Sequence, residues 1–252
     1  MVRKRLYSNT WPWRMSKRSS LAAVMSVALL GWTAEASATL IASYRSSDEV
    51  IIAADSLRTV RTVPRVRIHA CKIRNFGEVV FAAAGDSTLP GQGFSIQTIS
   101  AGLHQKNKVG PEAVRDRIAK FDRQTIAAFK KLHKQRRKTR PVTFTYIVAF
   151  VLEGRPVAYL RTLKSADGAV EIGRLETLAE GVVVFTGQSG IVDHLSGVSR
   201  PDDPTPAALL EAAIKHQARR IPDKVGGPVD IIRLTKNGVT WLQRKPECRE
   251  RE

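Results

Sequence analysis

Short runs of apolar residues recur along the chain and are separated by polar turns, so that most of them form pairs. Paired β-rich runs with a polar connection are typical of antiparallel hairpins. The last pair turns at Asn237-Gly238, a dipeptide that favours tight hairpin turns. The pattern predicts strands at Thr39–Tyr44, Val50–Ala54, Lys72–Asn75, Glu78–Ala84, Val142–Leu152, Val157–Leu163, Val182–Thr186, Val229–Leu234 and Val239–Leu242.

Two longer segments have helical spacing instead. Apolar residues recur every three or four positions from about Pro111 to Lys138, which predicts one amphipathic helix. A second helix is predicted to begin at Asp203 or Thr205, with Pro206 in its first turn, and to continue to Ala218. Strand pairs, helices and further strand pairs predict a single α+β domain over residues 39–252. We expect two packed antiparallel sheets with helices on the outside.

Residues 1–38 have the pattern of a secretory signal peptide. A basic pair, Lys17-Arg18, precedes the apolar run Leu21–Leu30, and Ala36-Ser37-Ala38 supplies the small residues that signal peptidase accepts. We expect cleavage after Ala38 and a periplasmic or secreted protein that meets the membrane only during export. An uncleaved anchor and an N-terminal helix are the alternatives. In an oxidising compartment the two cysteines, Cys71 and Cys248, either pair or remain separate thiols.

The chain is strongly basic, with 41 Lys and Arg against 23 Asp and Glu and a formal charge of +18. Its most basic stretch, Lys130–Arg140, indicates either an anionic partner such as nucleic acid or a solvated helix end. We favour the second interpretation and expect no nucleic acid, because no aromatic residues are interleaved for base stacking. The histidines lack metal-ligand spacing, so neither a metal nor a cofactor is predicted.

Thr39 acquires special chemistry if the predicted cleavage occurs. Cleavage after Ala38 would make it the first residue, with a free α-amine beside its hydroxyl. An amine has a lone pair, and its ordinary pKa of about 7.7–8.0 makes it a usable base near neutral pH. A base beside a hydroxyl is the N-terminal form of the nucleophile–base pair. The alternative is that Thr39 is simply the first strand residue of the mature chain.

Four short segments follow the predicted cleavage site: Thr39-Leu-Ile-Ala-Ser-Tyr, Val50-Ile-Ile-Ala-Ala-Asp55-Ser56, Cys71-Lys72-Ile73 and Val79-Val-Phe-Ala-Ala-Ala-Gly85. Their order and spacing resemble the proteasome β-subunit family of N-terminal nucleophile hydrolases, of the threonine peptidase type. The likeness extends to the segment from Gly226 to Asp230. It implies a four-layer α/β/β/α sandwich, the fold of these hydrolases.

The resemblance also implies roles. Thr39 would be the nucleophile and its amine the general base, Lys72 would tune that amine, and Asp55 would hold Lys72. The N–H of Gly85 would be an oxyanion-hole donor. Two supporting groups match less well: Ser189 lies one place from the family's serine. The other, Asp223, precedes a stretch that is one residue short.

We therefore predict an exported threonine-type peptidase that acts without ATP on peptides or unfolded chains. The resemblance further implies a homo-oligomer. Two alternatives remain open: an amidohydrolase that uses the same nucleophile on a small amide, and a non-catalytic basic secreted scaffold.

Overall fold

The computed structural model describes residues 39–60, 66–85, 88–89, 94–104, 110–135, 141–166, 169–187 and 205–251. The predicted signal segment and Ser189 lie outside these ranges. Within them, no helix is both long enough and apolar enough to cross a membrane.

The first sheet is five-stranded and antiparallel, in the order β13-β1-β2-β14-β15. The strands β1 and β2 are connected at residues 46–48, and β14 turns into β15 at Asn237, so the two hairpins predicted for these strands are confirmed. The bounds are β1 (Leu40–Arg45), β2 (Glu49–Ala54), β13 (Val182–Gly187), β14 (Asp230–Thr235) and β15 (Gly238–Gln243).

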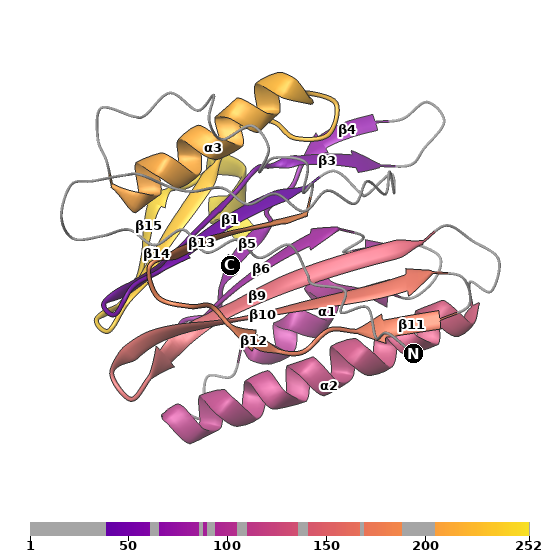
Figure 1. Ribbon diagram of the computed structural model, residues 1–252, viewed down its shortest axis with the longest axis horizontal. Helices are drawn as coiled ribbons and strands as arrows, with labels where there is room; N and C mark the ends of the chain where they lie inside the picture. Colours follow the sequence, from indigo (N-terminus) through magenta and orange to yellow (C-terminus); the bar gives the residue numbers. More distant parts are fainter. Residues whose placement is uncertain are drawn as a thin grey trace, which may run out of the picture.

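The second sheet has six strands, ordered β11-β10-β9-β6-β5, with β12 paired to β10. Its long central strands, β9 and β10, are paired from Arg155 opposite Leu152 to Ser165 opposite Val142, and Figure 1 shows them below the first sheet. The bounds are β5 (Ile73–Asn75), β6 (Val79–Gly85), β9 (Val142–Leu152), β10 (Arg155–Ala166), β11 (Ala169–Ile172) and β12 (Glu176–Thr177).

Two small two-stranded sheets lie outside this scheme and were not predicted. One pairs β3 (Leu57–Val60) with β4 (Val66–His69), and the other pairs β7 (Thr88–Leu89) with β8 (Phe94–Ser95). The β3–β4 hairpin occupies the segment between Asp55 and Lys72, and it therefore brings these two residues back together.

Both predicted helices are present. Helix α2 (Pro111–Gln135) begins at the expected proline, and the last residues of its predicted range lie outside the described part of the chain. Helix α3 (Pro206–Arg220) is capped by the side chain of Thr205, which accepts a hydrogen bond from the backbone N–H of Ala208. Shorter helical segments complete the fold: α1 (Ile96–Ser100), η1 (Ala101–Leu103) and η3 (Pro246–Arg251).

Three apolar clusters hold these elements together. Helix α2 packs through its Phe121 and Phe129 stripe onto the second sheet, and α3 packs through Leu210 and Ile214 onto the first. A separate cluster fills the space between the two sheets. Figure 1 shows the helices on the outer sides of the two sheets. The predicted α+β class with two antiparallel sheets is confirmed, whereas the finer assignment to the hydrolase sandwich stays a prediction.

Candidate active site

The carboxylate of Asp55 is the centre of a buried polar cluster. Asp55 follows β2 directly and its side chain is fully buried. Its Oδ1 accepts the N–H of Leu40 at 2.7 Å and the ammonium of Lys72 at 2.6 Å. Its Oδ2 accepts the N–H groups of Leu57 and Gly226, each at 3.2 Å. Every lone-pair direction is thus used, which offsets the cost of burying this charge.

The strand register places Asp55 beside the start of β1. Ile41 lies opposite Ala54, the last residue of β2. The N–H of Asp55 donates to the carbonyl of Leu40 at 3.1 Å, while Leu40 donates back to the Asp55 carboxylate. Thr39 is covalently joined to this doubly held residue and is itself buried. The position of Thr39 is therefore fixed by the same carboxylate that binds Lys72.

Lys72 reaches this cluster from the connection between β4 and β5. Its side chain is 7% exposed, and its partner carboxylate on Asp55 is fully buried. A buried ammonium needs such a partner, because removing either charge leaves the other unpaired in a low-dielectric environment.

Two glycines allow the strand ends to approach one another. Gly187, the last residue of β13, pairs with Leu40 and has a φ of +101°. A Cβ at Gly187 would lie 2.0 Å from the carbonyl oxygen of Thr39 and 3.2 Å from the Cβ of Ala84. The end of β6, at Ala84 and Gly85, therefore lies beside the beginning of β1.

Gly85, the last residue of β6, has a φ of +91°, and a Cβ there would lie 2.2 Å from the carbonyl oxygen of Thr143. Only glycine fits either position without displacing the backbone.

The structure thus brings Thr39, Asp55, Lys72 and the end of β6 at Gly85 to one end of the two sheets. Ser189 lies outside the described residues. Asp223 lies exposed in the turn after α3. That turn continues to Gly226, whose N–H binds the carboxylate of Asp55.

Sequence reasoning missed two supports of this cluster. Gly226 accepts the N–H groups of Ser56 and Leu57 through its carbonyl and donates its own N–H to Asp55. Gly187 gives the close approach to Thr39 described above. The available signal was the glycine type itself at the end of a predicted strand or helix, which indicates a backbone constraint but not its location.

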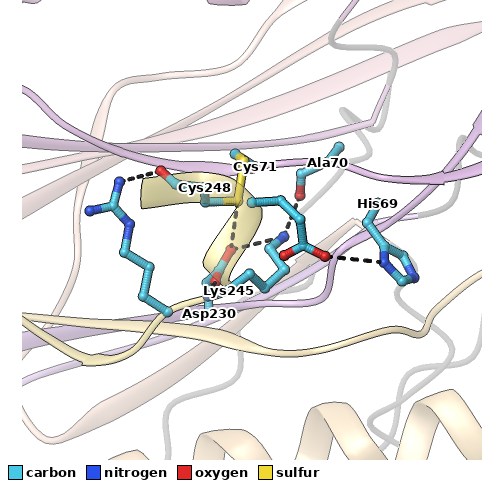
Figure 2. Close-up of a disulfide and its surroundings, with 8 residues drawn as sticks. His69, Ala70, Cys71, Asp230, Lys245 and Cys248 are labelled. Atoms are coloured by element: carbon cyan, nitrogen blue, oxygen red, sulfur yellow. Dashed lines mark hydrogen bonds and ion pairs between the residues drawn. A yellow bond between two sulfur atoms is a disulfide. The ribbon is translucent and has the colours of Figure 1, made fainter. Parts of the chain in front are cut away.

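The two cysteines form a disulfide, Cys71–Cys248, which joins residues 177 positions apart. Cys71 directly precedes Lys72. Figure 2 shows a second buried ion pair next to the disulfide, in which the ammonium of Lys245 lies 2.9 Å from Asp230. The sequence had left the pairing of these cysteines open.

Nucleophilic and acid–base chemistry are within the capacity of this arrangement. It contains a hydroxyl on Thr39, a buried ammonium on Lys72 and a carboxylate that fixes both. Among the described residues, no three His, Cys, Asp or Glu side chains are grouped so that they could hold a metal ion.

Comparisons with known proteins add little to this geometry. No family model matches the chain, and no curated protein matches it. One similar solved structure is the Anbu Gly-1 mutant from Hyphomicrobium sp. strain MC1, with a TM-score of 0.48 and 13% sequence identity. The match covers 83% of this chain and 89% of that one. A similarity of this size supports no conclusion about function.

The predicted membership of the proteasome β-subunit family of threonine peptidases is wrong. No family model matches, and the similarity to Anbu is too weak to supply an assignment. The physical reason lies in the motifs that suggested it. They are short, mostly apolar segments with a small or charged residue in or beside them, a composition that is common in buried antiparallel strands and at their ends.

Proposed function

We propose that this protein is a hydrolase whose nucleophile is the hydroxyl of Thr39, freed as the first residue by cleavage after Ala38. One observation carries the proposal. The buried carboxylate of Asp55 binds the ammonium of Lys72 and, through the same oxygen, the N–H of Leu40 next to Thr39. A cation is thereby held close to the residue that would carry the free amine.

The amine of Thr39 would act as the base. It takes the proton of the Oγ as this oxygen attacks a substrate carbonyl carbon, and it then returns that proton to the leaving amine. Water completes the cycle by hydrolysing the resulting ester. The ammonium of Lys72 favours the neutral amine, because two positive charges at close range repel. The N–H of Gly85 is our candidate donor to the oxyanion.

The substrate that we propose is a peptide bond in a peptide or an unfolded chain, cleaved without ATP. Export through the signal segment would place the enzyme in the periplasm or outside the cell, where ATP is absent. Self-association of the enzyme is part of the same proposal. The disulfide is compatible with an oxidising compartment.

The test begins with the exported protein. Its intact mass and N-terminal sequence should show a chain that starts at Thr39, and a threonine-directed covalent probe should label that residue. A mixture of fluorogenic peptides should be hydrolysed by the wild type and not by Thr39→Ala. Thr240→Ala, which changes an exposed threonine on β15, is the matched control and should retain full activity.

Two results would overturn the proposal. One is a mature chain that begins at any other residue, because the base would then be missing. The other is undiminished turnover by a correctly folded Thr39→Ala protein.

A further inference from the structure

Three consecutive residues before β5 are each bound to a different part of the chain. The N–H of Ala70 donates to the carbonyl of Ser56 at 2.8 Å, and the carbonyl of Ala70 accepts the ammonium of Lys245 at 2.6 Å. Cys71 is joined to Cys248, and Lys72 binds Asp55. The segment that presents Lys72 is therefore fixed by the C-terminal segment as well as by Asp55.

Lys245 is held as firmly as Lys72. Its ammonium lies 2.9 Å from Asp230 Oδ2, and its backbone N–H donates to Asp230 Oδ1, also at 2.9 Å. Both side chains are almost fully buried. The N–H of Cys248 donates to the carbonyl of Lys245 at 3.1 Å, which connects this pair to the disulfide. Figure 2 shows Asp230, Lys245 and Ala70 around the disulfide.

The two buried ion pairs are carried by neighbouring strands. In the register of β14 with β2, Asp230 lies opposite Ala54, which directly precedes Asp55. The Asp55–Lys72 pair and the Asp230–Lys245 pair thus hold the same short segment, Ala70–Lys72, through two adjacent strands.

A need for stability alone does not account for the second pair. Well-packed apolar residues commonly stabilise a core as much as a buried ion pair, because burying charges is costly. An apolar side chain at position 245, however, would not bind the carbonyl of Ala70. The ammonium of Lys245 donates one hydrogen bond to this carbonyl, which lies two residues before Lys72.

We propose that Asp230, Lys245 and the Cys71–Cys248 disulfide are positioning elements for Lys72. This inference rests on the proposed function, in which Lys72 lowers the pKa of the Thr39 amine. Loosening residues 70–72 would let the ammonium of Lys72 move away from that amine. The amine would then take up a proton at a higher pH, and the base would be lost over more of the acidic range.

The experiment uses the full chain, exported and processed, and compares two double variants with a conservative variant and a control. One is the double variant Cys71→Ser/Cys248→Ser, and the other is Asp230→Asn/Lys245→Met, which removes both charges and leaves neither unpaired. Lys245→Arg keeps a cationic donor at this position, so this variant should retain most of the wild-type activity and the wild-type pH profile. Thr205→Ala removes the cap of α3 and serves as a mildly destabilised control that leaves residues 70–72 intact.

The activity readout is the pH profile of kcat/KM. We expect both double variants to lose about 10- to 100-fold, a size typical of a small misplacement of a catalytic group. The acid limb of the profile should move to higher pH in both. Thr205→Ala should leave the limb in place. Folded double variants with an unmoved acid limb would overturn the proposal.

A second readout works without activity. The rate at which acetic anhydride acetylates Lys72, followed by peptide mass spectrometry, should rise at least 10-fold in both double variants, because the side chain of Lys72 is only 7% exposed and loosening its segment would expose it. The exposed Lys236 provides the internal reference. Faster acetylation of Lys72 in an enzyme without peptidase activity would support the positioning and refute the proposed function. Unchanged acetylation in folded variants would refute the positioning.

Discussion

Gly187 lies against the carbonyl oxygen of Thr39 so closely that a Cβ at Gly187 would be 2.0 Å from that oxygen. Gly187→Ala must therefore displace Thr39 or the end of β13. The left-handed φ of +101° adds about 1–2 kcal/mol of strain. We expect a loss of turnover of about 100-fold or more, measured on peptide substrates, since displacements near 1 Å have that effect.

Gly238→Ala is the matched control for this prediction. Gly238 has a φ of +116°, but nothing lies within 4 Å of the position its Cβ would take. Gly238→Ala should therefore strain the backbone without displacing Thr39. We expect a lower melting temperature and full activity. Equal losses of activity in the two variants would mean that the contact with Thr39 is unimportant.

Asp55→Asn should strongly lower the free energy of unfolding. This effect is expected whether or not the protein is an enzyme. The carboxylate accepts three backbone N–H groups and binds Lys72, and the variant leaves the buried ammonium without its counter-charge. Breaking a buried pair in this way costs about 3–5 kcal/mol. Urea denaturation of the variant should show a midpoint far below that of the wild type.

Asp48→Asn tests whether loss of any carboxylate has this effect. Asp48 is exposed in the turn after β1, so the expected change is within about 0.5 kcal/mol. A small effect at Asp55 as well would show that the cluster around it contributes little to folding.

The sheets could be predicted from the sequence largely because most of their strands are short, buried and joined by polar turns. The hairpin of β14 and β15 follows from alternation and an Asn-Gly turn. The strand β10 extends beyond the predicted Val157–Leu163 at both ends, since Arg155 and Lys164 continue the ladder with β9 despite their polarity. The hairpin of β3 and β4 was missed because each strand is only four residues long and mixes apolar residues with polar and basic ones.

The candidate site could be predicted from the sequence only in part. Asp55 and Lys72 were singled out by the resemblance of the segments that contain them, and the structure has their charged atoms 2.6 Å apart; their roles stay predictions. The pairing of Asp230 with Lys245 joins a strand to the C-terminal segment. No short motif encodes a contact of this kind, because it depends on the register of β14 with β15, in which Ile231 lies opposite Gln243 and the register shifts between Ile231 and Ile232.

Tyr146 on β9 connects the second sheet to α2, and this connection can be tested by measuring stability at alkaline pH. Its hydroxyl donates to Asp122 on α2, and Arg161 on β10 donates to the same carboxylate at 2.9 Å. Burial, followed by the hydrogen bond to Asp122 and the charge of this residue, raises the pKa of Tyr146 well above its ordinary value of 10.0. The folded state thus keeps the phenol protonated, whereas the unfolded chain ionises near pH 10.

The stability that Tyr146 contributes is therefore fully present below pH 10 and is lost as the pH rises above it. At pH 8, Tyr146→Phe should cost about 1–2 kcal/mol for the lost hydrogen bond. One pH unit above 10 removes about 1.4 kcal/mol from the wild type alone. The two proteins should consequently have nearly equal unfolding free energies at pH 11 in denaturant titrations. Phe150→Leu, a core change without a titrating group, should cost the same at both pH values; a Tyr146→Phe deficit that stays constant up to pH 11 would contradict the raised pKa.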